Sequence, residues 1–237
     1  HGQIRRQRQM CIRDSVIKYH YEPTYPHCRK PGMIDLSKTD KKTDNEYFPP
    51  LKEPNIMTYL AKDWVAPQKS YKDAMIESMT HLGKLGAIFI GYNVKYGNAI
   101  GTLKNVPDDQ KLETPVAENL MAGLAIGMSF EGFLPVLYYE RHDFMMVAAD
   151  AIINHIDKIE RISHGEFKCP IIIRAVTADA GPFYSGITHS QDFTEVFRRA
   201  VSFPVLDPVN GAGVTSCLLA ARRSGKPCMI IERKSRY

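Results

Sequence analysis

From residue 70 onwards, short apolar segments with strand character alternate with longer segments of helical spacing. The most apolar of these strands, 170–176, contains three consecutive isoleucines and is almost uninterrupted, as strands buried on both faces are. Strands separated by helices imply right-handed crossovers and a parallel sheet between two helical layers. We therefore expect an α/β fold: a three-layer helix–sheet–helix arrangement with a mostly parallel sheet, preceded by an irregular N-terminal arm.

The element boundaries follow from capping and turn residues. Ser70 is a plausible cap for the first helix, and Gly86 is its stop. The expected helices are 71–85, 116–130, 144–162, 193–200 and 211–224, and the expected strands are 87–90, 134–139, 170–176, 204–206 and 227–232. Glycine-containing loops are expected at 96–101 and 178–191. In such sheets ligands collect beyond the carboxyl ends of the strands, so Phe144, the loop 178–191 and the start of helix 116–130 should share one rim.

The helix expected at 116–130 consists mainly of apolar and small residues, and it has one carboxylate near its start, Glu118. Burying a carboxylate is costly unless it is protonated or given a partner. An acid in the first turn can also simply complement the helix dipole. Taken alone, the residue leaves both readings open.

Residues 1–69 lack the alternation. The segment 10–15 (Met-Cys-Ile-Arg-Asp-Ser) is the translation of a transposon-end sequencing adapter, so we expect 1–15 to be read-through in an assembled environmental sequence; a genuine basic arm is the alternative. Residues 16–69 contain seven prolines and a charged run at 38–44, which is typical of an extended or disordered leader, with a short helix near 57–63. The folded domain is expected at 70–237.

Bulk properties exclude several classes of protein. The net charge is +5, but four arginines and one aspartate lie in residues 1–15, so the rest is nearly neutral. A nucleic-acid partner needs a basic face on the fold itself, and we expect none. The five cysteines form no Cys-x-x-Cys pair, which favours a reduced, cytoplasmic protein without disulfides or a zinc site. No stretch reaches the roughly 18 apolar residues of a membrane span.

Four short motifs follow one another along the domain. They are Thr114, Pro115 and Glu118; Asp143 and Phe144; Asp150, Ile152 and Asn154; and His189, Ser190 and Gln191. In order and spacing they resemble the transketolase-like pyrimidine-binding domain of thiamine diphosphate enzymes. The likeness is greatest to the beta subunit of the pyruvate and branched-chain 2-oxo acid dehydrogenases, and it runs from about residue 71 to 237.

The resemblance implies a role for three residues. Glu118 would hydrogen-bond the ring nitrogen N1′ of the cofactor's aminopyrimidine, which requires a carboxyl that holds or shares its proton; burial among Leu120, Met121 and Leu124 would supply that environment. Phe144 would stack on the aminopyrimidine face. His189 would act in acid–base steps and in recognition of the acceptor lipoyl group. The catalytic candidates are thus Glu118 and His189, the cofactor-binding candidates Glu118 and Phe144, and no metal ligand is expected.

The same resemblance implies partners. The family holds the diphosphate through Mg²⁺ with a Gly-Asp-Gly motif, which this sequence lacks. We therefore expect thiamine diphosphate to be shared with an alpha-type subunit that brings the Mg²⁺ site, and a heterotetramer with a second beta subunit. A lipoyl-bearing acyltransferase is a possible further partner. Because the family continues into a further C-terminal domain, the chain is also expected to be a fragment that is inactive alone.

Two departures from the family pattern leave the substrate open. Glu140, Arg141 and His142 place three ionisable groups where apolar residues are usual, and Gly91-Tyr92-Asn93 lacks the acid that commonly follows this glycine. The leading hypothesis is the pyrimidine-binding half of a thiamine diphosphate-dependent 2-oxo acid dehydrogenase. The alternatives are a non-catalytic or regulatory homologue that keeps the fold and partner interface, the C-terminal half of a split transketolase-like enzyme, and a nucleic-acid binder acting through the arginine tail.

Overall fold

The structure, a computed structural model, describes residues 69–179 and 184–237. The segments 1–15 and 16–68, with the helix expected near 57–63, lie outside the described residues, as do 180–183 of the loop 178–191. The described residues form one sheet with strand order β2-β1-β3-β4-β6-β5, and every pairing is parallel. Its strands are β1 (Ala87–Gly91), β2 (Lys111–Glu113), β3 (Leu134–Tyr139), β4 (Ile172–Thr177), β5 (Val205–Leu206) and β6 (Cys228–Arg233).

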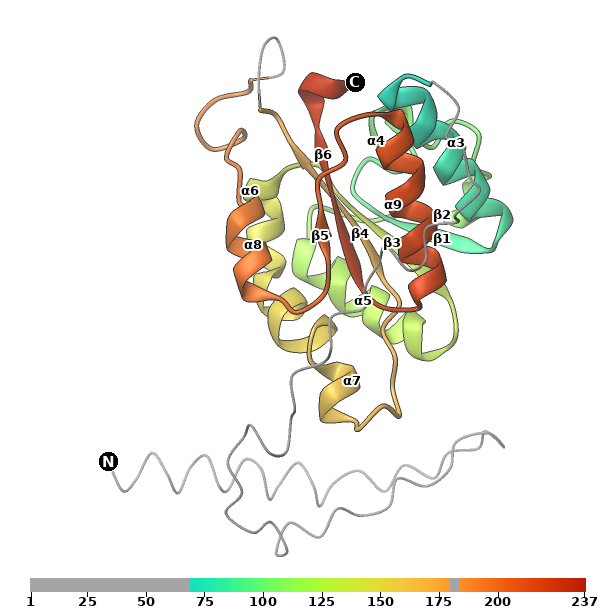
Figure 1. The fold of residues 1–237 in the computed structure, drawn as a ribbon, viewed down its shortest axis with the longest axis vertical. Coiled ribbons are helices and arrows are strands. Elements are labelled where there is room, and N and C mark those ends of the chain that lie inside the picture. Colours follow the sequence, from blue (N-terminus) through green and yellow to red (C-terminus); the bar gives the residue numbers. More distant parts are fainter. Residues whose placement is uncertain (1–68, 180–183) are drawn as a thin grey trace, which may run out of the picture. The chain divides into compact units, whose positions relative to one another are not determined.

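Helices cover both faces of this sheet (Figure 1), which confirms the expected three-layer α/β fold. On one face lie α3 (Tyr71–Lys84) and α9 (Gly211–Ser224), which also pack on each other. On the other lie α5 (Glu118–Phe130), α6 (His142–Met145), α7 (Ile159–Ile162) and α8 (Thr194–Ala200). Successive strand residues point to opposite faces. In β3, Tyr138 therefore joins the cluster under α3 and α9, and Tyr139 joins the cluster under α5.

The predicted start of α3 after Ser70 and the predicted bounds of α9 are confirmed, and α3 ends one residue before the predicted end. The Ser70 hydroxyl accepts a hydrogen bond from the Asp73 amide at 3.1 Å, and Gly86 has a φ of 83° just beyond the helix. The Asn210 side chain caps α9 by accepting from the Gly213 amide at 2.8 Å. Side-chain caps satisfy backbone donors that would otherwise lack a partner, so local sequence is sufficient to place these ends.

The helix expected at 144–162 is not a single helix. Helical structure begins earlier, at α6, and continues through a 3-10 turn (Met146–Ala148) and a π-helical stretch (Ala151–Ile156) before α7. At the end of the π-helical stretch, the Asp157 amide donates to the Ile152 carbonyl at 3.1 Å, five residues back. The Asp157 carboxylate accepts from the Ser202 amide at 2.7 Å. A tertiary partner thus fixes Asp157, and helical spacing alone could not show it.

Strand β2 was not predicted, because a segment of three residues, two of them charged, carries little strand signal. It pairs with β1 through tertiary contacts: Lys111 is buried, and its amine donates to Asn98 Oδ1 at 2.8 Å. The loop expected at 96–101 contains a short helical turn, α4 (Asn98–Gly101), in which Ala99 and Ile100 have φ of 46° and 60°. The Thr102 hydroxyl holds this turn by donating to the Ala99 carbonyl at 2.6 Å.

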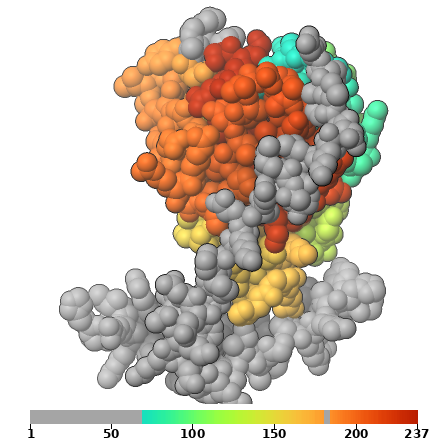
Figure 2. Space-filling view, viewed as in Figure 1, coloured from blue at the N-terminus to red at the C-terminus, as the bar shows by residue number. Residues whose placement is uncertain are grey.

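Residues 184–237, coloured orange to red, make up most of the visible surface of the described part in the space-filling view (Figure 2). They include α8 and the loop that carries His189, whose side chain is exposed. None of the helices in the described ranges combines the length and the apolar character that crossing a membrane would require.

Candidate functional site

Glu118 is the first residue of α5, directly after the loop that leaves β2. The loop is held at the carboxyl end of the sheet, where the Thr114 amide donates to the Gly91 carbonyl at 3.0 Å. Glu118 is only 9% exposed, and the hydroxyl of Tyr139, the last residue of β3, donates to its main-chain carbonyl at 3.2 Å. The predicted convergence of this helix start with the sheet rim is therefore present.

The surroundings predicted for Glu118 are partly wrong. Met121 is buried, but Leu120 is 58% exposed and Leu124 is 37% exposed. Helical periodicity explains the difference, because residues three, four and seven positions apart share a face. Glu118, Met121, Ala122 and Ala125 face the sheet, whereas Leu120 and Leu124 lie on the outer face of α5. Burial of Glu118 within this chain therefore comes from the sheet side.

Phe144 and His189 come together, although they are 45 positions apart in the sequence. Their ring centroids are 5.2 Å apart and the planes meet at 85°, an edge-on contact. Phe144 is half-buried in α6, immediately after β3, whereas His189 is exposed. The Nδ1 atom of His189 lies 2.9 Å from the Thr188 hydroxyl. Two of the three predicted site residues thus touch directly.

Glu118 opens α5 and Phe144 lies in α6, and both helices cover the same sheet face. Met121 lies one turn after Glu118, and Met145 follows Phe144; both belong to the single buried cluster under α5 and α6. Because β2 and β3 are parallel to β1, the loops that follow them leave the sheet at the same edge. This edge therefore carries a buried carboxylate, an aromatic ring and a histidine.

The loop that carries His189 is tied to the sheet rim by several side chains. The Arg233 guanidinium, at the end of β6, donates to Asp192 at 2.7 Å, and the Ser235 amide donates to Asp179 at 3.1 Å. Partial burial acts to raise the pKa of Asp192, but hydrogen bonds from Thr194 and Arg233 lower it to about 2 overall. Asp192 is therefore a stable anion on which the end of this loop is anchored.

The three ionisable groups expected at the mouth of the site do not all lie there. His142 is fully buried, and its Nδ1 accepts a hydrogen bond from the Phe193 amide at 3.1 Å. Burial lowers the pKa of His142. His142 therefore does not lie at the mouth of the site, because its ring is turned inward and bonded to Phe193, the residue before α8. Arg141 remains at the strand end, where it donates to the Glu140 carbonyl at 2.7 Å.

A buried ion pair was missed by the sequence analysis. Arg174 in β4 and Glu232 in β6 have no exposed side-chain surface, and an Arg174 Nη2 donor lies 2.9 Å from Glu232 Oε2. Arg174 also donates to the Thr102 hydroxyl at 2.9 Å and lies over the Tyr138 ring at 5.1 Å, and the Tyr237 hydroxyl donates to Glu232. The sequence signal that could have indicated this ion pair is that each of two apolar strand segments contains one charged residue, Arg174 or Glu232.

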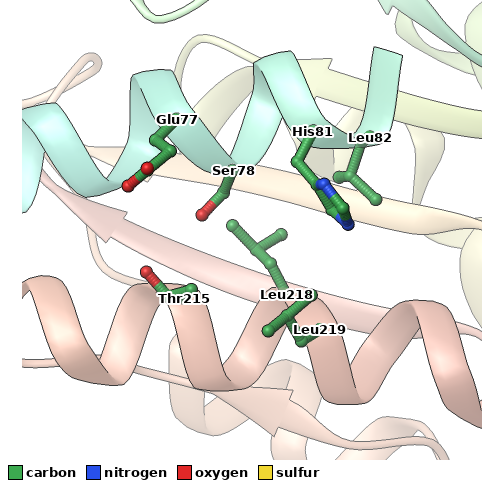
Figure 3. A pocket seen from close by; sticks show the side chains of 7 residues that line it. All are labelled: Glu77, Ser78, His81, Leu82, Thr215, Leu218 and Leu219. Carbon is green, nitrogen blue, oxygen red and sulfur yellow. The ribbon is translucent and has the colours of Figure 1, made fainter. Parts of the chain in front are cut away.

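A pocket of about 260 Å³ lies between α3 and α9. Side chains of both helices line it (Figure 3), among them Ser78 and His81 from α3 and Thr215 from α9. These helices cover the sheet face opposite to α5 and α6, so the pocket is separate from the candidate site. Across residues 69–179 and 184–237, no three His, Cys, Asp or Glu side chains are grouped so that they could hold a metal ion.

The family model described as "Transketolase, pyrimidine binding domain" matches residues 65–237. The chain is 28% identical over 176 residues to the pyruvate dehydrogenase E1 component subunit beta of Rickettsia felis. This match covers 73% of this chain and 53% of that protein. It is 28% identical over 137 residues to the 2-oxoisovalerate dehydrogenase subunit beta of Bacillus subtilis, with coverages of 58% and 41%. The chain spans about half the length of these curated relatives or less.

Among solved structures, the protein titled "Split gene transketolase, inactive beta4 tetramer" matches with a TM-score of 0.56 at 17% identity. The match covers 71% of this chain and 52% of that one. At this identity the likeness concerns the fold alone.

Proposed function

Because this chain belongs to the transketolase pyrimidine-binding domain family, we propose that it is the pyrimidine-binding half of a thiamine diphosphate-dependent 2-oxo acid dehydrogenase. The observation that carries the proposal is the arrangement at the carboxyl edge of the sheet. There the buried Glu118 opens α5, and the Phe144 and His189 rings meet edge-on at 5.2 Å on the same edge.

The side chains present fit an aminopyrimidine. A mostly buried carboxyl is suited to hydrogen-bond a ring nitrogen, because little water competes for it. An aromatic ring that is half-buried at a helix start leaves a face for stacking. When bound, thiamine diphosphate supplies the carbanion-stabilising chemistry of decarboxylation. In the proposed roles, Glu118 orients the ring and holds a proton at its nitrogen, Phe144 packs on the ring face, and His189 moves protons on the exposed side.

The proposal includes partner chains. The sequence has no Gly-Asp-Gly motif, and residues 69–179 and 184–237 hold no group of metal-ligating side chains. An alpha-type subunit would supply the diphosphate and Mg²⁺ site, since Mg²⁺ takes hard oxygen ligands. The outer face of α5 supports a contact with another chain: Leu120 and Leu124 are exposed there, and a Cβ built on Gly123 or Gly127 meets no described atom within 4 Å apart from the adjoining backbone of its own helix.

Reconstitution tests this function. The chain is combined with an alpha-type subunit that carries Gly-Asp-Gly, and thiamine diphosphate binding and 2-oxo acid decarboxylation with an artificial electron acceptor are measured. We expect Glu118→Gln to reduce turnover by about a hundredfold or more, since it removes an acid–base group. Glu131→Gln is the matched control, because Glu131 is exposed at the opposite end of α5.

Equal turnover of the Glu118→Gln and Glu131→Gln complexes would overturn the assignment of Glu118. A complex that assembles and binds thiamine diphosphate without turning over any 2-oxo acid would instead identify the non-catalytic homologue. The charged Glu140 and Arg141 at the end of β3 are the feature that favours this second candidate, because the strand end lies next to Phe144.

A further inference from the structure

Both carboxylate oxygens of Asp143 are engaged by one residue of the loop that carries His189. The Gln191 side-chain amide donates to Asp143 Oδ1 at 2.7 Å, and the Gln191 main-chain amide donates to Asp143 Oδ2 at 3.3 Å. The two residues are 48 positions apart in sequence. A side-chain amide and a main-chain amide of one residue on one carboxylate form a two-point contact, which restricts rotation as well as separation.

This contact lies beside the two rings of the candidate site. Asp143 precedes Phe144 in α6, and Gln191 follows His189 by two residues. The same two segments are therefore joined by two neighbouring contacts: the 5.2 Å ring contact between Phe144 and His189, and the hydrogen-bonded pair Asp143–Gln191. The Gln191 carbonyl also accepts from the Thr177 hydroxyl at 3.3 Å, which fixes Gln191 to the end of β4.

His189 has little else in the described part to hold it. Its side chain is exposed. Its Nδ1 atom lies 2.9 Å from the hydroxyl of Thr188 and its amide donates to the Gly186 carbonyl, but both of these partners belong to the same loop. The further anchors of the loop, Asp179 and Asp192, lie near its two ends. Of these ties to the rest of the domain, the one at Gln191 is the closest to His189 along the chain.

We propose that Asp143 is a positioning residue that, through Gln191, holds the His189 ring in its edge-on contact with the Phe144 ring. The idea rests on the proposed function for its catalytic consequence, but the positioning itself is a property of the chain alone. Asp143 is half-buried and Gln191 is exposed. Removing the pair therefore changes the local geometry without opening the core.

The first test measures ring geometry in the full chain without cofactor. The histidines are labelled with ¹³C and ¹⁵N, and the His189 ring resonances are assigned by their loss in His189→Gln. Phe144→Leu removes the ring-current shift and gives the reference for a His189 without its neighbour. We expect Asp143→Ala and Gln191→Ala each to move the His189 resonances at least halfway towards that reference, and the double variant to move them no further than either single variant.

Asp150→Ala is the matched control. Asp150 accepts from the Asn154 side-chain amide at 2.7 Å, an exposed carboxylate–amide pair on the same helical stretch but without a link to His189. It should leave the His189 resonances in place. Asp143→Asn should restore most of the wild-type shift, because its amide oxygen can still accept from Gln191. His189 resonances that are unchanged in both Asp143→Ala and Gln191→Ala would overturn the proposal.

The second test uses the reconstituted complex. Asp143→Ala and Gln191→Ala should each lower kcat about tenfold, with less than a threefold change in the KM for the 2-oxo acid, because a misplaced His189 affects proton transfer more than binding. Thermal unfolding of each variant checks that the domain stays folded. If the His189 ring is displaced without any loss of kcat, the proposal that Asp143 positions His189 still holds. The result would then count against the role of His189 in the proposed function.

Discussion

The hydroxyl of Tyr139, the last residue of β3, donates a hydrogen bond to the main-chain carbonyl of Glu118, the first residue of α5, at 3.2 Å. The bond is buried, and it joins the end of a central strand to the start of the helix that carries the candidate catalytic carboxylate. The position of Glu118 is therefore set from the sheet as well as from the helix.

Tyr139→Phe should lower the free energy of unfolding by about 1 kcal/mol, the usual net value of one such bond. It should also weaken thiamine diphosphate binding to the reconstituted complex several-fold, because the start of α5 is less constrained. Urea denaturation and cofactor titration measure the two effects. Tyr138→Phe is the control: the Tyr138 hydroxyl is buried without a hydrogen-bond partner among the described residues, so its removal should cost nothing. Equal losses in both variants would contradict the role of the bond.

Glu232→Gln should destabilise the domain strongly. It leaves the Arg174 guanidinium buried without its carboxylate, and breaking such a pair costs about 3–5 kcal/mol. Replacing both residues by Met and Leu should cost much less than Glu232→Gln alone, because no unpaired charge remains. Glu195→Gln, which breaks the exposed ion pair of Glu195 with Arg198 in α8, should change stability by less than about 1 kcal/mol. Guanidinium denaturation of the three variants ranks these costs.

His142 should make stability depend on pH in mildly acidic solution. Burial lowers its pKa in the folded protein, with Arg233 acting in the same direction and Asp192, the Ala175 carbonyl and Asp143 acting against it. The unfolded chain takes up a proton near pH 6.5 while the folded protein does not, so the unfolded state binds more protons. Stability should therefore fall as pH decreases from about 6.5 towards the folded pKa, by at most about 1.4 kcal/mol per pH unit, and level off below it.

The measurement is the free energy of unfolding between pH 5 and 8, conditions chosen to bracket this window. His142→Gln should flatten the dependence, whereas His155→Gln, which alters an exposed histidine, should preserve it. An unchanged slope in His142→Gln would show that other groups are responsible.

Two substitutions of Gly123 test the outer face of α5, one in the isolated chain and one in the complex. A Cβ added there meets no atom within 4 Å, so Gly123→Ala should stabilise the isolated chain by about 0.5–1 kcal/mol through helix propensity. Gly123→Leu should weaken association with the alpha-type subunit or a second copy at least tenfold, because it adds bulk to the outer face of α5. Sedimentation velocity measures assembly, and Lys72→Leu on the exposed side of α3 is the control for added bulk. Unimpaired assembly of Gly123→Leu would exclude this face as the contact.

Local sequence determined the fold class and most element boundaries. Apolar strands alternating with helical segments predicted the layered parallel sheet, and Ser70 and Gly86 marked the two ends of the first helix. These features depend on residues within about one turn of each other, which is why they can be read without tertiary information. Placing Glu118, Phe144 and the loop 178–191 on one rim needed only the direction of the strands.

Only the tertiary structure decided which side chains meet. The Asp143–Gln191 pair joins residues 48 positions apart, and Arg174 and Glu232 are 58 apart. His142 is buried because the start of α8 donates to its ring, and Leu120 is exposed because Glu118 takes the sheet side of α5. Such contacts arise when distant segments pack and exclude water, and the free energy of each depends on neighbours that local spacing does not specify. For this protein, the sequence placed the candidate residues on one edge, and packing fixed their orientation.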